Sequence, residues 1–299
     1  MESLLLIPTC LLLGFIVARV ASPPKDMVPA LNWWVIQVAL PALVLELIPR
    51  LSFTIDLWFL IVSQWLVFIG AAIVMQLIGS WLGWSRARIG VLILVCGLGN
   101  TSFIGYPMLE ALRGREGLAL GVVADQLGCF IMLSVGGVLV TAVYGGAATS
   151  ASVIAKKILL FPAFIALIIG LVVGQLGGWP EQIDSILARI GATLTPLALF
   201  SVGLRLRLSL YKYQLAPVAI GLSWKLLLAP LVMFGLGSAL AVSSAVLSIA
   251  VLQAAMAPMI SAAILAEQHD LEPDLANAIL GIGIILSLLT VTAWHVLLP

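Results

Sequence analysis

The stretch Gly99-Asn100-Thr101-Ser102-Phe103-Ile104-Gly105-Tyr106-Pro107 lies inside a hydrophobic segment that runs from about residue 88 to residue 112. Glycine, a polar pair and proline interrupt a helix there, at a depth where lipid offers no hydrogen bonds. Such backbone is tolerated in a bilayer only where protein buries it or where it lines a cavity. The sequence therefore predicts a broken membrane helix whose unwound backbone faces protein or a cavity.

A second interruption, Gln253-Ala254-Ala255-Met256-Ala257-Pro258-Met259-Ile260-Ser261, lies in the segment 244–268 of the other half of the chain. Paired broken helices in matching halves are the best sequence indication of a transporter's binding site. The N-terminal ends of half-helices carry unpaired N–H groups and partial positive charge, which favour a carboxylate. The predicted substrate-binding residues are Gly99, Asn100, Thr101, Gly105, Pro107, Gln253, Pro258 and Ser261.

The composition excludes several other classes of function. The chain has 299 residues, of which 63% are hydrophobic and 9% charged, whereas soluble domains carry roughly 25% charged residues. The net charge of +1 gives no basic surface for nucleic acid. An intramembrane enzyme needs paired aspartates, a Ser–His pair or a metal cluster. One deep aspartate and two distant histidines offer none of these, so we expect no catalytic residue, metal or cofactor.

Ten segments qualify as membrane spans of about 20 apolar residues each, which predicts an all-α polytopic membrane protein. They cover residues 3–20, 31–49, 56–82, 88–112, 117–143, 156–177, 182–204, 212–239, 244–268 and 273–297. The small residues from Gly145 to Ser150 divide the chain into five-helix halves, 1–145 and 151–299. Five is an odd number, so the second half inserts with opposite orientation, as an inverted repeat. Pro41 and Pro196 are expected to kink equivalent helices.

The distribution of basic residues predicts that both termini lie outside the membrane. Nine would then face the cytoplasm, namely Arg19, Lys25, Arg86, Arg88, Lys156, Lys157, Arg205, Arg207 and Lys212. Four would face outward, namely Arg50, Arg113, Arg115 and Arg189. We interpret Arg113 and Arg115 as solvated loop charges. Glu46 is expected to pair with Arg50, because the two are four residues apart on a helix.

Lys225 is the one basic residue deep within a predicted span, and Asp125 is the deepest acidic one. Ionisable side chains in the membrane usually face the bundle interior and pair with one another. We predict one polar cluster of Lys225, Asp125 and Gln126, which serves proton coupling or binds substrate charge. A structural ion pair or a snorkelling lysine is the alternative.

Both interruptions resemble those of the auxin efflux carrier family. The resemblance begins at Gly99–Pro107 and continues in the segments Glu116-Gly117-Leu118-Ala119-Leu120, Asp125-Gln126, Ala255-Met256-Ala257-Pro258 and Ala262-Ala263-Ile264-Leu265-Ala266-Glu267. It implies a fold similar to bile-acid symporters and sodium/proton antiporters, with broken helices four and nine crossing each other. The first, second, sixth and seventh helices would form a scaffold. The third to fifth and eighth to tenth would form a transport domain that moves as an elevator.

The resemblance also implies export or exchange of small organic anions, such as auxin, malate or malonate. One position departs from the family, because members commonly have asparagine where this chain has Ser261. A serine has a shorter reach and fewer donors than an amide. A channel or a membrane ligand sensor on the same fold remains the alternative function. A bacterial cytoplasmic membrane, a proton as coupling ion and a homodimer through the scaffold complete the expectations.

Overall fold

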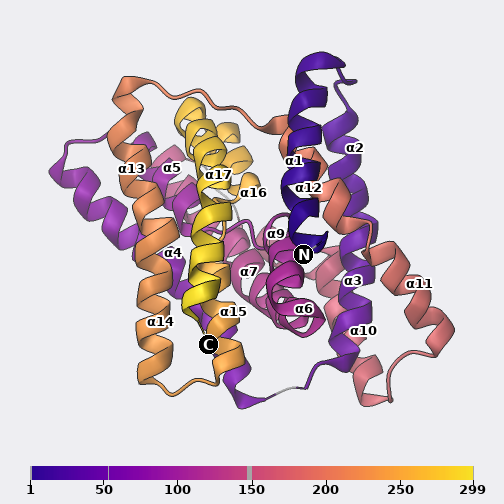
Figure 1. The fold of residues 1–299 in the computed structure, drawn as a ribbon. Helices are drawn as coiled ribbons and strands as arrows, with labels where there is room; N and C mark the ends of the chain where they lie inside the picture. Colours follow the sequence, from indigo (N-terminus) through magenta and orange to yellow (C-terminus); the bar gives the residue numbers. More distant parts are fainter. Residues whose placement is uncertain (1, 53, 147–149, 299) are drawn as a thin grey trace. The chain divides into compact units, whose positions relative to one another are not determined.

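The computed structural model describes residues 2–52, 54–146 and 150–298, so residues 147–149 of the predicted linker lie outside the described residues. The described chain is helical, and its β-type pairing is confined to one isolated bridge (Figure 1). Within those ranges six helical segments are long and apolar enough to cross a membrane. A seventh results if the bent pair α9 (Ala151–Leu159) and α10 (Pro162–Gln175) counts as one span. This is the architecture of an integral multi-pass membrane protein.

The predicted broken helices are present as separate pieces. In the first half, α5 (Arg86–Gly97) ends and α6 (Gly105–Val123) begins after the non-helical residues 98–104. In the second half, α15 (Ser244–Ala254) and α16 (Ile260–Gln268) flank the non-helical residues 255–259. α5, α15 and α16 are each too short to span a bilayer alone, since a span needs about 20 residues. α6 belongs to the long apolar segment Gly105–Gly145 and has non-helical backbone at Gly114. The number of ten spans therefore stays a prediction.

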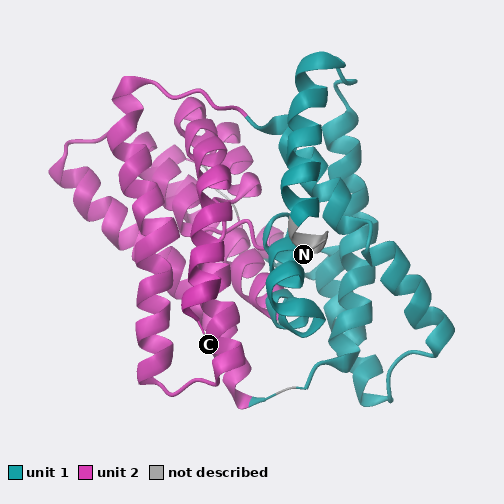
Figure 2. Ribbon diagram, in the orientation of Figure 1, with its two compact units in different colours: residues 1–54, 102–122, 155–206 teal, residues 55–101, 123–154, 207–299 magenta. Residues whose placement is uncertain are grey.

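The chain forms two compact units, which are coloured separately in Figure 2. Unit 1 comprises residues 1–54, 102–122 and 155–206, and unit 2 comprises residues 55–101, 123–154 and 207–299. Each unit thus draws on both halves of the sequence. All four segments predicted as scaffold fall in unit 1, which also contains residues 102–122 of the predicted transport segments. The assignment of the units to a scaffold and a transport domain stays a prediction.

Unit 1 is built on two helix contacts, α1 (Glu2–Val20) against α12 (Leu194–Arg205) and α3 (Leu40–Leu47) against α10. Gly14 and Gly203 lie at the first contact. A Cβ on Gly203 would lie 2.3 Å from the Leu11 carbonyl oxygen, and one on Gly14 would lie 2.2 Å from the Phe200 carbonyl oxygen. Small residues let membrane helices approach closely and pack their backbones together. The two glycines therefore set the distance between α1 and α12.

The irregular backbone of unit 1 lies close to the two prolines expected to kink its helices. A π-helical turn, Val35–Ala39, directly precedes Pro41 at the second residue of α3. Pro196 is the third residue of α12, just after α11 (Glu181–Gly191) ends. Pro41 thus lies inside the continuous helical segment Met27–Arg50, where a π-helical turn accompanies the N–H that proline lacks. Pro196 lies inside the segment Glu181–Arg205, shortly after the turn that separates α11 from α12.

Unit 2 is centred on the half-helices α5 and α15. All residues from Ile89 to Gly97 and from Val246 to Ala254 are buried. A helix that is apolar on every side belongs inside a bundle, which explains why neither segment has a polar face. The surrounding helices include α4 (Trp58–Trp81), which packs on both, and α17 (Pro273–Leu297), which also contacts both. The two half-helices end inside this core.

Candidate functional site

The unwound segments that follow α5 and α15 pair with each other. The Asn100 N–H donates to the Ala257 carbonyl at 2.7 Å, and the Met259 N–H donates to the Leu98 carbonyl at 3.1 Å. Gly99 and Pro258 face each other between these bonds as an isolated antiparallel bridge. The two broken helices therefore satisfy part of each other's free backbone groups inside unit 2. We call this pairing, residues 98–100 with 257–259, the crossing.

Glycine and proline suit the two central positions of the crossing. Gly99 has no room for a side chain, because a Cβ would lie 3.0 Å from Lys225 Nζ and 3.3 Å from the Gln253 carbonyl oxygen. Pro258 needs no N–H, because the hydrogen bonds of the bridge are made by the residues on either side. Its ring is accommodated at Gly283 of α17, where a Cβ would lie 2.6 Å from the proline Cδ.

Asn100 brings to the crossing a polar side chain with an unpaired hydrogen-bond donor. The residue is only 3% exposed, and its Nδ2 has no hydrogen-bond partner among the described residues. Gln126 is 1% exposed and its Oε1 also lacks a partner in the described part of the chain. Buried polar groups are nearly always paired, and leaving one unpaired costs about 1–3 kcal/mol. Such groups are what a bound ligand can satisfy.

The Asp125 carboxylate lies beside the crossing and accepts hydrogen bonds from Thr101 and Gln126. The Thr101 hydroxyl donates to Oδ1, and Gln126 Nε2 donates to Oδ2 at 2.7 Å. Asp125 and Gln126 belong to a π-helical turn, Ala124–Cys129, that widens the helix at this level. π-helical turns occur frequently at functional sites. The Thr101 hydroxyl is therefore already used as a donor to Asp125. Of the polar pair Asn100 and Thr101, Asn100 is the one with an unpaired donor among the described residues.

Lys225 approaches the crossing from a second π-helical turn, Trp224–Leu228, between α13 (Leu215–Ser223) and α14 (Ala229–Ala239). Its side chain is fully buried, and Nζ donates to the carbonyl of Ala254, the last residue of α15, at 2.9 Å. The predicted partners Asp125 and Lys225 therefore both lie against the crossing.

Cys129 is a site residue that the sequence analysis missed. Its Sγ donates to the Gly99 carbonyl at 3.3 Å. The signal was its spacing, because Cys129 lies four residues after Asp125 and so projects toward the same side of a helix.

Of the remaining predicted site residues, Ser261, Gly105 and Pro107 lie apart from these contacts. Ser261 is the second residue of α16 and is exposed. Gly105 and Pro107 are buried in the first turn of α6, which belongs to unit 1. Gln253 is fully buried in the last turn of α15, and its backbone carbonyl lies next to Gly99. We call residues 98–104 the first arm of the crossing and residues 255–261 the second arm. The side chains near the crossing thus come mainly from the first arm and from the π-helical turns that carry Asp125 and Lys225.

Unit 1 contains a cluster of ion pairs around the buried carboxylate of Glu46. Arg50 Nη1 lies 3.2 Å from Glu46 Oε1, which confirms the predicted pair. Arg115 also contacts Glu46, and it lies 3.2 Å from Glu110 as well. Arg115 is exposed, as expected of a solvated charge, but it is also held by these two carboxylates. A buried carboxylate on α3 attracts this arginine of α6 from 69 positions away in the sequence.

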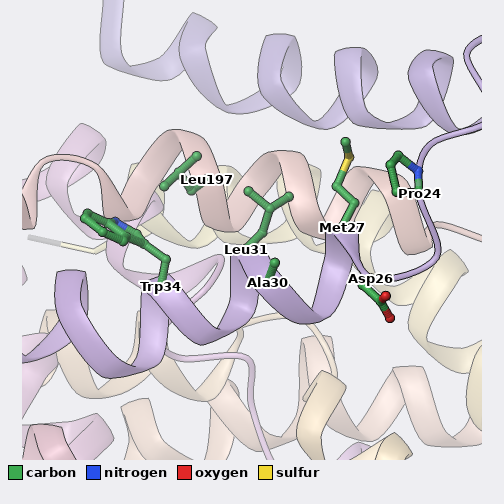
Figure 3. A pocket seen from close by; sticks show the side chains of 7 residues that line it. All are labelled: Pro24, Asp26, Met27, Ala30, Leu31, Trp34 and Leu197. Carbon is green, nitrogen blue, oxygen red and sulfur yellow. The ribbon is translucent and has the colours of Figure 1, made fainter.

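A separate cavity in unit 1 is a weaker candidate for an anion. It has a volume of about 460 Å³ and lies between α2 (Met27–Trp34) and Leu197 of α12 (Figure 3). Figure 3 shows Met27, Leu31 and Trp34 lining it with apolar surface. Asp26 is its one charged lining residue, and the cavity offers an anion no cationic side chain. The crossing also has a carboxylate nearby, but it combines Lys225 with the Asn100 Nδ2 that has no partner among the described residues, so it is the stronger candidate.

The model of the family described as membrane transport protein matches residues 1–295. The chain belongs to this family. The membrane transport protein family is that of the auxin efflux carriers, so the resemblance noted in the sequence is confirmed. This family member is a membrane transport protein whose apolar helices agree with multi-pass insertion.

Two archaeal relatives agree with this assignment. An uncharacterized transporter of Methanothermobacter thermautotrophicus is 29% identical over 300 residues, which cover 99% of this chain and 98% of the relative. An uncharacterized transporter of Methanocaldococcus jannaschii is 25% identical over 211 residues, which cover 69% and 68%. The similarity to the first relative extends over both halves and both broken helices of this membrane transport protein.

Proposed function

We propose that this protein is a secondary transporter of small organic anions that works by alternating access. The observation that carries the proposal is the buried crossing, where Asn100 Nδ2 has no hydrogen-bond partner among the described residues. A carboxylate oxygen is a strong acceptor for such a donor, and hydrogen bonds to charged groups contribute about 1.5–3 kcal/mol. The substrate site would thus lie where the two broken helices pair.

The proposed site favours an anion for a second reason. α16 begins directly after Met259, so its unpaired N–H groups and partial positive charge lie next to the crossing. Lys225 adds a cationic side chain within the same core. Simple mono- or dicarboxylates such as malate or malonate, or an auxin-like acid, fit this chemistry. The number of carboxylate groups and the size of the acid would determine which of these compounds the protein binds best.

We further propose that the broken pairs α5–α6 and α15–α16 are the fourth and ninth of ten spans in an inverted 5+5 repeat. Support comes from the local symmetry of the crossing, where the same pair of hydrogen bonds is exchanged around Gly99 and Pro258. Unit 2 would supply most of the moving transport domain, and the helices of unit 1 would supply the scaffold and the surface of a homodimer. Both termini would lie outside a bacterial cytoplasmic membrane.

Ion coupling is assigned in this proposal to Asp125, Gln126 and Lys225. Asp125 and Lys225 are ionisable groups buried in the membrane core, where such residues usually mark ion or proton pathways. Asp125 also contacts Thr101 of the first arm directly. A proton taken up by this cluster would therefore change the charge beside the substrate.

A panel of carboxylates tests the substrate class. We expect at least one mono- or dicarboxylate to raise the melting temperature of the purified protein in a saturable way, because a ligand of the native state stabilises it. The matched control is the corresponding alcohol or amide at the same ionic strength. Stabilisation by neutral analogues alone, or by no carboxylate, would contradict the assignment of an organic anion.

A further inference from the structure

The ammonium group of Lys225 lies where the two half-helices of unit 2 end. Nζ is 2.9 Å from the carbonyl oxygen of Ala254, the last residue of α15. It is also 3.0 Å from the position that a Cβ on Gly99 would take, two residues after the end of α5. One cation therefore lies at the C-terminal ends of both broken helices.

Those helix ends favour a positive charge. The last carbonyl groups of a helix have no intrahelical partner and carry partial negative charge. In unit 2 two such ends meet in a fully buried environment, and the Asp125 carboxylate lies beside them through its contact with Thr101. In secondary transporters, unwound carbonyl groups and half-helix C-terminal ends are the groups that coordinate a sodium ion. Here Lys225 is bound to one of them.

We propose that Lys225 is a built-in cation that takes the place of a bound Na⁺ at the crossing, so that removing its side chain creates a Na⁺ site. The inference rests on the proposed function, because it names the residue that makes transport independent of Na⁺. A shortened side chain leaves the Ala254 carbonyl, which binds Nζ in the wild type, without its donor. The Gln253 carbonyl lies beside Gly99 and the Asp125 carboxylate beside Thr101, so both are oxygen atoms of the same buried region that an ion could recruit.

The test compares the wild-type chain with Lys225→Ala and Lys225→Met in detergent, by thermal unfolding in NaCl and in choline chloride at equal ionic strength. The alanine variant leaves space for an ion, whereas methionine fills the same space without charge. We expect the wild type to unfold at the same temperature in both salts. Lys225→Ala should show a saturable, Na⁺-specific rise of about 3 °C or more. Lys225→Met and the double variant Lys225→Ala/Asp125→Asn should show no such rise.

Three results would overturn the inference. One is a Na⁺-specific stabilisation of the wild type. A second is an equal response of Lys225→Ala to Na⁺ and choline, which would leave Lys225 as a structural cation only. The third is a Lys225→Ala variant that fails to fold in NaCl as well as in choline chloride. If the substitution destabilises the protein severely, the inference predicts that NaCl alone restores folding. No carboxylate is present in this experiment, so its outcome is independent of the carboxylate panel.

Discussion

Replacing Asn100 by alanine is expected to weaken substrate binding by about 10- to 100-fold, which corresponds to the loss of one hydrogen bond to a charged acceptor. The reason is that Nδ2 is the buried donor left unpaired at the crossing among the described residues. Without substrate, the variant should unfold at the wild-type temperature or slightly above it, because the substitution removes an unsatisfied polar group. Titration of the stabilising carboxylate against melting temperature measures both quantities.

Ser261→Ala is the matched control on the second arm. Ser261 is exposed at the start of α16, so its loss should change the dissociation constant less than the loss of Asn100. An equal or larger effect of Ser261→Ala would place the substrate on the second arm instead. Loss of stability in Asn100→Ala without substrate would show that Asn100 has a structural role.

Gly203→Ala is expected to lower the stability of unit 1 strongly. Its new Cβ would lie 2.3 Å from the Leu11 carbonyl oxygen of α1 and 3.0 Å from Gly14 Cα. Backbone atoms cannot rotate away as a side chain can, so α1 and α12 must separate. Overpacking of this kind typically costs about 1–3 kcal/mol and occasionally more. Thermal unfolding of the purified variant measures the loss.

Gly235→Ala provides the control for this prediction. Gly235 also lies inside a helix, α14, but its Cβ would meet no atom within 4 Å. Alanine favours helix by about 1 kcal/mol over glycine, so this variant should be as stable as the wild type or more stable. Equal melting temperatures for the two variants would contradict the close approach of α1 and α12.

The broken helices could be predicted because their cause is local. Glycine, asparagine and proline within an apolar run interrupt a helix whatever surrounds it. Glu46 and Arg50 are likewise four residues apart, so their pairing follows from helix geometry alone. The family resemblance added that the two interruptions meet each other, which neither segment indicates by itself.

The missed features depend on contacts between distant segments. Lys225 binds the backbone carbonyl of Ala254, and a carbonyl has no signature in the sequence because every residue carries one. Arg115 pairs with Glu46 across 69 positions, so its charged turn resembles a solvated loop until the helices pack. Both contacts required the tertiary structure. The break at Gly114, whose φ is 69°, by contrast falls between the predicted segments 88–112 and 117–143.

Counterflow in liposomes tests the central claim most directly. Purified protein is reconstituted, the vesicles are loaded with the unlabelled carboxylate that stabilises the protein, and uptake of the labelled compound is followed. An alternating-access carrier that binds its substrate at the crossing predicts faster, saturable uptake into loaded vesicles than into empty ones, and a strong loss of this exchange in Asn100→Ala. Flux that rises linearly with concentration, ignores the internal carboxylate and persists in Asn100→Ala would contradict the account.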